Sequence, residues 1–515
     1  MGISTFALAR PFRGERAQRR LTETGISLAV AAAAASSTWF IDHWGTRRGL
    51  AMGLFVLALA WLATTRRTLV ALAVLMLYLG CVDGYAKLST GSTAVSLVRD
   101  ALLFAIVAGV LVRGQGSAQP MKLPPLSLWV IGFVVLVLVQ LLNPNDGTLV
   151  HSLGGVRQHL EFVPLFFLAF AFVRSKAALR GFVILLLVIG AANGVAGYIQ
   201  FGLTQQQFAA WGPGYAERVL ATGRFVDAGR TFAATEDVNR VRPFGLGSDA
   251  GAGGVMGAFA LGALLAMIAR GRRLRYLLLA AALATFVVTA IVTSQGRGAV
   301  VSAAIILIAY GGFTIAAGGR LVALLSIGAT ALVAVAVFQG VLSSTGSSGG
   351  AGDTFRYSGL ASSRIVQTTT VARGGSFEAI PENLVKYPFG AGLAVAGPAS
   401  GAPGGTPLSG TIDAESWFSF MVVEAGIGGM LVVTGFTVML LWLGLTRIRF
   451  EPDAETRTLL AAIVAPIAAM LALYVVGGGV TATTPYAPYL WAVGGIASYW
   501  LIVRPRELAA ARVSA

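Results

Sequence analysis

The chain consists of long apolar runs, separated by short basic segments and by two long polar segments. Runs such as 182–203 and 321–341 lack the polar stripe, recurring at every third or fourth position, that marks a helix on the surface of a soluble protein. About 20 apolar residues, each rising ~1.5 Å, cross the hydrocarbon layer of a bilayer. The pattern therefore predicts an all-α, polytopic integral membrane protein with about 12–14 transmembrane helices and two long external loops.

The predicted spans differ in length. They cover 24–41, 49–63, 68–84, 96–112, 125–142, 161–173, 182–203, 250–269, 276–293, 299–316, 321–341, 416–446, 458–477 and 488–503. The run 161–173 is short for a full crossing, and 416–446 is too long for one, so we expect the first turns of 416–446 to lie in the membrane interface. A composition of 56% hydrophobic and 12% charged residues leaves no room for a large soluble domain.

Lysine and arginine recur in alternate segments between the spans. Counted from a cytoplasmic N-terminus, the inner segments that hold them are 10–20, 66–67, 113–122, 174–180, 270–275, 320, 447–457 and 504–512. The outer segments hold few for their length, with the exception of Arg47 and Arg48. Because basic residues collect on the cytoplasmic side of a membrane protein, both termini are predicted to be cytoplasmic. The same alternation places 143–160, 204–247 and 342–413 outside.

The net charge of +16 follows from this distribution rather than from a basic domain. Basic residues spread over cytoplasmic loops contact anionic membrane lipids, whereas a nucleic-acid partner would require a clustered basic surface and is not predicted. The single cysteine, Cys81, excludes an intramolecular disulfide and a cysteine-based metal site. Three histidines are too few and too scattered for a metal centre, and we expect His151 and His159 at the membrane surface.

Ionisable residues at the external ends of spans are the candidates for chemistry, because charges near the membrane are costly unless they are paired or functional. Arg240 and Arg242 precede PFGLGSDAGAGG, Arg297 lies in TSQGRGAV, and DAESWFSFMVVEAGIGG contains Asp413, Glu415 and Glu424. Each also has a structural interpretation. An arginine can extend to lipid headgroups, Glu415 can stabilise a helix N-terminus, and Glu424 can pair with an arginine.

Taken together, these residues indicate a more specific chemistry. Arginine binds phosphate through two parallel hydrogen bonds and keeps its charge at any working pH. A carboxylate can act as a general base towards an incoming hydroxyl. A site that binds a lipid-linked pyrophosphate and deprotonates a sugar hydroxyl needs both kinds of group close to the membrane surface.

Over roughly residues 180–480, the chain resembles the O-antigen ligase and polymerase superfamily of bacterial membrane glycan transferases. The resemblance rests on Arg242 before PFGLGSDAG, the TSQGRGAV turn, YPFGAGL at 387–393 and ESWFSFMVVEAGIGG at 415–429. The last segment is similar to the family pattern of His-Asn, an aromatic residue and then Glu-x-Gly-x-x-Gly. With Glu424 aligned, Glu415 falls where the ligases carry histidine, which favours a polymerase or another glycan transferase over a strict ligase.

The resemblance implies a metal-independent, inverting glycosyltransferase of the bacterial inner membrane that uses no cofactor. Its donor would be an undecaprenyl-pyrophosphate-linked glycan, and its acceptor a hydroxyl of a glycan or lipid at the outer leaflet. Arg242 and Arg297 would bind the pyrophosphate and Glu415 would be the general base. Arg240, Asp413 and Glu424 would support them.

The predicted organisation is a basic cytoplasmic N-terminus (1–23), N-terminal transmembrane helices (24–180), a core resembling the superfamily (181–480), and a last transmembrane helix with a cytoplasmic C-terminus (481–515). A transporter or flippase for a lipid or glycan is the alternative function. It would need a substrate path that reaches the inner side, and Asp83 and Asp100, which lie inside predicted spans, favour it.

Overall fold

The structure of the chain is a computed structural model. It describes residues 33, 46–92, 94–114, 123–145, 147–220, 231–235, 238–270, 274–319, 327–328, 378–400, 404–406, 408, 412, 416–476 and 480–514. Most of the predicted spans 24–41 and 321–341 lies outside the described residues, as do Asp413 and Glu415.

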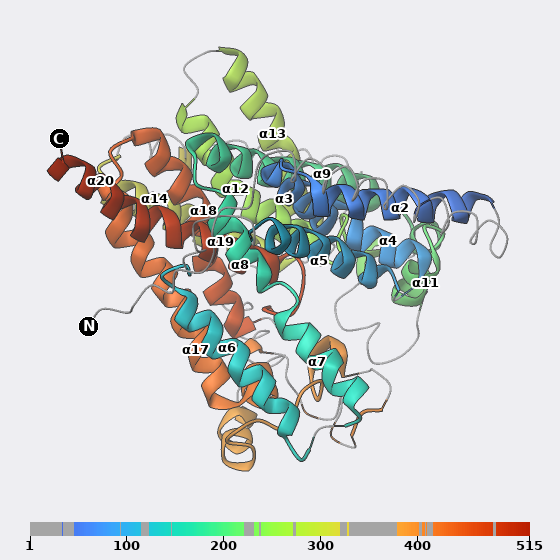
Figure 1. Cartoon of the computed structure of the whole chain (residues 1–515). Helices are drawn as coiled ribbons and strands as arrows, with labels where there is room; N and C mark the ends of the chain where they lie inside the picture. The colour runs from blue at the N-terminus through green and yellow to red at the C-terminus, as the bar shows by residue number, and fades with distance from the viewer. Residues whose placement is uncertain are drawn as a thin grey trace. The chain divides into compact units, whose positions relative to one another are not determined.

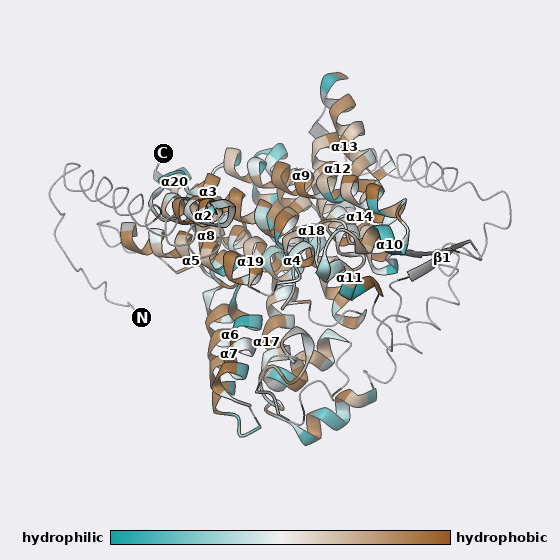
Figure 2. Cartoon of the chain, turned by 90° about the vertical axis from the view of Figure 1, so that its right-hand side faces the viewer, coloured by the Kyte–Doolittle hydropathy of each residue, from teal (hydrophilic) through white to brown (hydrophobic). Residues whose placement is uncertain are grey.

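Seven helices of the described residues are long and apolar enough to cross a membrane: Thr68–Thr90, Val95–Val112, Lys176–Phe201, Ala252–Ala269, Arg297–Ala316, Trp417–Phe450 and Ala454–Val475. Shorter apolar helices cover Gly49–Thr64, Ser127–Leu142 and Leu278–Thr293. Every one of them overlaps a predicted span, and stretches of hydrophobic residues, brown in Figure 2, run along these helices. The chain is therefore an all-α, multi-pass membrane protein, as predicted.

The chain forms two compact units, Met1–Leu75 with Ser96–Leu123, and Met76–Val95 with Pro124–Ala515. The first unit contains α2 (Thr46–Thr64), most of α3 (Thr68–Leu77) and nearly all of α5 (Val95–Gly114). Within it, a β-carbon added to Gly109 of α5 would lie 2.1 Å from the Ala63 carbonyl oxygen of α2. A small residue at this position therefore permits the close approach of the two backbones.

The second unit is built around a bundle of α9 (Lys176–Phe201), α12 (Ala252–Arg270), α13 (Leu274–Thr293), α14 (Arg297–Ala316) and α18 (Ala454–Val476), in which α12 contacts the other helices (Figure 1). Glycines let these helices approach closely. A β-carbon at Gly194 would lie 1.9 Å from the Phe286 carbonyl oxygen, and one at Gly262 would lie 2.4 Å from that of Ala462. α19 (Tyr486–Ala497), continued by the π-helix η6 (Ser498–Val503), packs on α8 (Pro164–Phe172).

The predicted span 161–173 is the second half of a longer, broken helix. α6 (Ser127–Val139) and its 3-10 turn η2 (Gln140–Leu142) lead to α7 (Leu149–Leu160), which is separated from α8 only by residues 161–163. Thr148 caps α7 by accepting a hydrogen bond from the His151 amide. The segment 143–160, which was predicted to lie outside, is therefore helical over most of its length, and most polar residues of α7 are buried in the protein.

α17 (Trp417–Arg447), followed by the 3-10 turn η5 (Ile448–Phe450), accounts for the unusually long run 416–446. The helix is kinked at Gly426, whose φ of 68° and ψ of −177° belong to a region that is open essentially to glycine alone. Nearly all residues from Trp417 to the kink are buried inside the protein. The excess length is thus used for a buried helical segment that precedes the kink.

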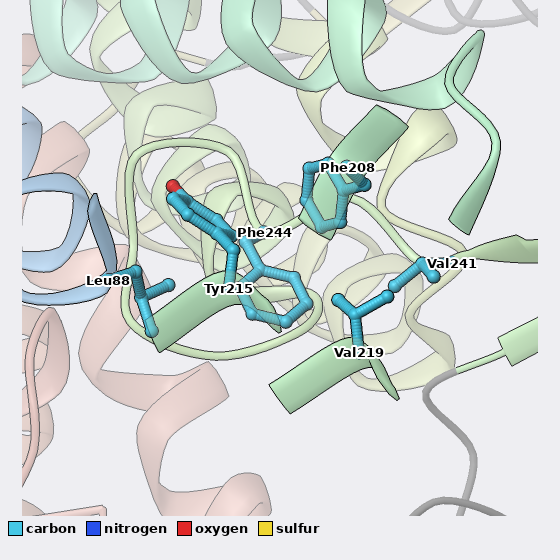
Figure 3. Packing of buried hydrophobic residues seen from close by; sticks show 6 residues of the cluster. All are labelled: Leu88, Phe208, Tyr215, Val219, Val241 and Phe244. Atoms are coloured by element: carbon cyan, nitrogen blue, oxygen red, sulfur yellow. The ribbon is translucent and has the colours of Figure 1, made fainter. Parts of the chain in front are cut away.

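The described residues of the segment 204–247, which was predicted to be external, form short elements. These are α10 (Gln205–Ala209), α11 (Pro213–Leu220) and an antiparallel hairpin of β1 (Thr231–Thr235) and β2 (Val238–Val241), the one departure from helix that we find in the described residues. An apolar cluster holds them against α4 (Asp83–Thr90), which continues from the π-helix η1 (Tyr78–Val82). The buried members of the cluster are Leu88, Phe208, Tyr215, Val219, Val241 and Phe244 (Figure 3).

Ion pairs gather where α18 begins. Lys176 contacts Asp453 and Glu455 at 2.7 Å each, and Arg180 contacts Glu455 at 2.7 Å. The Lys176 ammonium lowers the pKa of Asp453 to about 2. At the start of α20 (Arg504–Ser514), Arg504 contacts Glu451 at 2.8 Å. Residues of the segments 174–180, 447–457 and 504–512, which were predicted to share one side of the membrane, therefore meet at one end of the bundle.

Candidate functional site

Arg242 extends between two glycine-bearing turns. Its Nη2 atom lies 2.6 Å from the position of a β-carbon added at Gly251 and 3.1 Å from that of one added at Gly296. Its Nε donates a hydrogen bond to the Ser294 carbonyl oxygen at 3.4 Å. A larger residue at either glycine would displace the guanidinium. The structure thus brings Arg242 to the turn that immediately precedes Arg297.

Arg297 is the first residue of α14, and Gly296 is the N-cap. The Ser294 hydroxyl stabilises the turn by donating to the Ile291 carbonyl at 2.7 Å and accepting from the Gly296 amide at 3.2 Å. The N-terminus of a helix carries a partial positive charge, which adds to the guanidinium charge of Arg242 beside the turn. This arrangement favours an anion with several oxygen atoms, such as a phosphate group.

Two buried amides of α9 hold the segment that follows Arg242. Gln200 accepts hydrogen bonds from the Phe244 and Gly245 amides at 2.9 and 2.8 Å, and donates to the Gly245 carbonyl at 2.7 Å. Asn193 accepts from the Leu246 amide at 2.9 Å. Sequence reasoning did not single out these residues, although two amides inside an apolar run were a usable signal.

The start of α17 is linked to the start of α14 through α18. The Trp417 ring stacks on Tyr474 of α18 with ring centroids 3.8 Å apart, and its Nε1 donates to the Thr481 hydroxyl at 2.8 Å. The residue before Tyr474 approaches α14, because Leu473 Cδ2 lies 3.7 Å from a β-carbon added at Gly298. Two successive packing contacts therefore connect the first turn of α17 with the first turn of α14.

The structure describes only one of the remaining predicted residues Arg240, Asp413 and Glu415. Arg240 lies in β2, opposite Phe232 of β1. Asp413 and Glu415 are outside the described residues, but Ser416, the residue after Glu415, is the N-cap of α17 and is fully buried. The chemical roles of Arg240, Asp413 and Glu415 stay predictions.

Glu424 is fully buried in α17, two residues before the kink. One carboxylate oxygen accepts a hydrogen bond from the Ala396 amide at 2.8 Å. The other accepts from Gln158 Nε2 at 3.1 Å and contacts His159 Nε2 at 2.8 Å. The expectation of an arginine partner for Glu424 was therefore wrong, because a histidine and an amide of α7 take that position.

His151 and His159 are also buried, at 0% and 1% exposure, so their predicted surface role was wrong. His159 lies between Phe133 and Phe420, with ring centroids 6.2 and 5.4 Å away. His151 Nε2 is 3.0 Å from the Ala394 carbonyl oxygen. Both histidines face the protein interior because the face of α7 that carries them packs on the segment around Ala394.

Residues 389–399, which we call the clamped segment, end in the 3-10 turn η4 (Gly397–Ala399). Residues 391–396 are buried, and the Ala391 amide donates to the Val423 carbonyl at 2.6 Å. Gln140 donates to the Phe389 carbonyl, and Asn143 donates to that of Gly390 at 2.9 Å. The Ala399 amide donates to Gln158 Oε1 at 2.7 Å. The segment is therefore fixed by side chains at and just after η2, by Gln158 of α7, and by the backbone and Glu424 of α17.

Backbone strain occurs in two of the segments that carry the resemblance or adjoin it. Among described residues other than glycine, positive φ angles occur at Gln295 (49°) and Ala394 (56°). Gln295 lies in TSQGRGAV, and Ala394 directly follows YPFGAGL. Such conformations cost about 1–3 kcal/mol each, persist only where the surroundings enforce them, and cluster at functional sites.

Two groups of residues thus emerge from the described parts of the chain. One is the turn of Arg297 with Arg242 beside it, which α18 links to the start of α17. The other is the buried carboxylate of Glu424 with α7 and the clamped segment. No protein-family model, curated protein or solved structure matches this chain.

Proposed function

We propose that this protein is a membrane glycosyltransferase that moves a glycan from an undecaprenyl-pyrophosphate-type donor to a hydroxyl acceptor at the outer leaflet, as a polysaccharide polymerase or ligase does. The observation that carries the proposal is the placement of the Arg242 guanidinium on the turn that begins α14 at Arg297. Two arginines and a helix N-terminus at one turn suit a pyrophosphate leaving group, the place where negative charge develops during transfer.

In the proposed reaction, Glu415 removes the proton from the acceptor hydroxyl as its oxygen bonds to the anomeric carbon. The bond between that carbon and the pyrophosphate oxygen breaks, the configuration inverts, and undecaprenyl pyrophosphate leaves with both electrons of the broken bond. Arg242 and Arg297 stabilise the departing charge. Glu424 is a poorer candidate for the base, because both of its oxygens are engaged by α7 and the clamped segment.

Replacing Arg297 by lysine should lower the transfer rate about 10- to 100-fold. Lysine keeps the charge but loses the planar pair of donors, and a hydrogen bond to a charged group contributes about 1.5–3 kcal/mol. Arg242→Ala should weaken donor binding as well as turnover. The measurement is the rate of release of undecaprenyl pyrophosphate by purified variants, with Arg506→Lys, an exposed arginine of α20, as control. Wild-type turnover in Arg297→Lys would assign Arg297 a purely structural role.

The proposed orientation predicts which positions react from outside the cell. In a Cys81→Ser background, single cysteines at Gln206 and Val385, both exposed, should react with an impermeant maleimide in intact cells. A cysteine at Ala510, exposed on α20, should react only after permeabilisation, because basic segments stay on the cytoplasmic side. Protection of both external positions, or labelling of Ala510→Cys in intact cells, would refute the orientation.

A further inference from the structure

The Glu424 carboxylate joins three parts of the fold that are distant in sequence. It lies on α17, binds Gln158 and His159 of α7, and accepts the Ala396 amide of the clamped segment. A charge with no exposure would be costly to bury without these donors. An apolar side chain of similar volume would fill the same space without the desolvation cost of a carboxylate. A carboxylate at this position therefore selects the one arrangement of α7 and the clamped segment in which its oxygens have donors.

The network bears on the described residues that flank the stretch 400–415, which contains Glu415. Before the stretch, the Ala399 amide is bound by Gln158, which itself binds Glu424. After it, α17 begins at Ser416 and carries Glu424 two turns further on. The two chain ends that flank 400–415 are therefore tied to a single buried carboxylate and to the face of α7 that packs against it.

We propose that Glu424, acting through Gln158 and the clamped segment, is a positioning residue that holds the clamped segment and the start of α17 in the arrangement that transfer requires. The effect on catalysis rests on the proposed function. The structural part of the inference, that Glu424 holds the clamped segment in place, does not depend on it. The strained backbone of Ala394, two residues before the amide that Glu424 binds, is the conformation that the network maintains.

The structural part is tested with a single cysteine at Ala396 in a Cys81→Ser background. Ala396 is 2% exposed, so its cysteine should react slowly with a maleimide. Glu424→Ala should raise the labelling rate about tenfold or more, because the clamped segment loses the acceptor at its centre. Gln158→Ala should raise the labelling rate by a smaller factor. If Glu424→Ala does not fold, the labelling rate in Gln158→Ala tests the proposal instead.

Glu451→Ala is the matched control. It removes a carboxylate of similar burial (3% exposed), whose partner Arg504 lies where α20 begins. Labelling of the cysteine at Ala396 should not change in this variant. An unchanged rate in Glu424→Ala and Gln158→Ala would overturn the proposal, and so would an equal rise in Glu451→Ala, which would show only general loosening.

The catalytic part is tested with Glu424→Gln, which keeps the shape of the side chain but turns one acceptor into a donor facing the same donors. We expect kcat to fall about 10²-fold, as displacements of about 1 Å can produce, with the KM for donor nearly unchanged. A rise in KM with unchanged kcat would contradict positioning. The two proposals can fail separately. If the wild-type chain transfers no glycan but Glu424→Ala still raises the labelling of the cysteine at Ala396, the proposed function fails and the structural role of Glu424 stands.

Discussion

Glu415→Gln should lower the rate of glycan transfer by about 10²–10⁴-fold, because removal of a general base typically costs that much. Glutamine keeps the shape and hydrogen-bonding capacity of the side chain but cannot take the proton of the acceptor hydroxyl. Donor binding should change little, since the pyrophosphate is assigned to Arg242 and Arg297. The measurement is single-turnover transfer together with the donor affinity of the same preparation.

The competing interpretation is that Glu415 only stabilises the start of α17, where Ser416 is the N-cap. In that case the substitution should cost about 0.5–2 kcal/mol of stability with a modest effect on rate. Glu415→His is the sharper variant, because it restores the residue type that the ligases of the resembled superfamily carry. Partial activity that follows an imidazole-like pKa would support an interchangeable base, and full activity of Glu415→Gln would exclude Glu415 from the mechanism.

Gly426→Ala should destabilise the protein by about 2–6 kcal/mol, a large share of the ~5–15 kcal/mol typical of a folded protein. Two effects add. The φ of 68° with ψ of −177° is strained for any residue with a β-carbon. That β-carbon would also lie 2.7 Å from the carbonyl carbon of Phe389, where the clamped segment begins.

Gly428→Ala provides the matched control two residues further along α17. A β-carbon there meets only Leu136, at 3.5 Å, and the φ angle is not positive. Thermal unfolding of the two variants in detergent should therefore show a large loss for Gly426→Ala and almost none for Gly428→Ala. Equal midpoints would mean that the kink at Gly426 and its contact with the clamped segment are not features of the folded protein.

Most of the membrane-spanning framework was predictable, because an apolar run of sufficient length has few alternatives to a transmembrane helix. The helix within 143–160 was not predicted, and the reason is physical. Ser152, Gly155 and Gln158 resemble loop residues in sequence, yet they form the face of α7 that packs inside the protein. The polar face of α7 is turned towards the protein and its apolar residues are turned outwards. This is the reverse of a helix on the surface of a soluble protein.

The candidate site was predictable in part. Arg242 and Arg297 were selected from short motifs, and the structure brings Arg242 to the turn of Arg297. The partners of Glu424 could not be predicted, since His159 lies 265 positions away and no local pattern joins them. Gly426 is the first glycine of the Glu-x-Gly-x-x-Gly pattern that begins at Glu424, but its role in the kink depends on a φ angle that sequence alone does not give.

The most direct test of the proposed function uses the purified full chain in proteoliposomes with an undecaprenyl-pyrophosphate-linked glycan that serves as both donor and acceptor. The measurement is the amount of free undecaprenyl pyrophosphate and the length of the glycan over time. We predict release of the lipid pyrophosphate with matching growth of the glycan, strongly reduced in Arg297→Lys and Glu415→Gln. An intact donor that instead crosses from one leaflet to the other would contradict a transferase and establish a transporter.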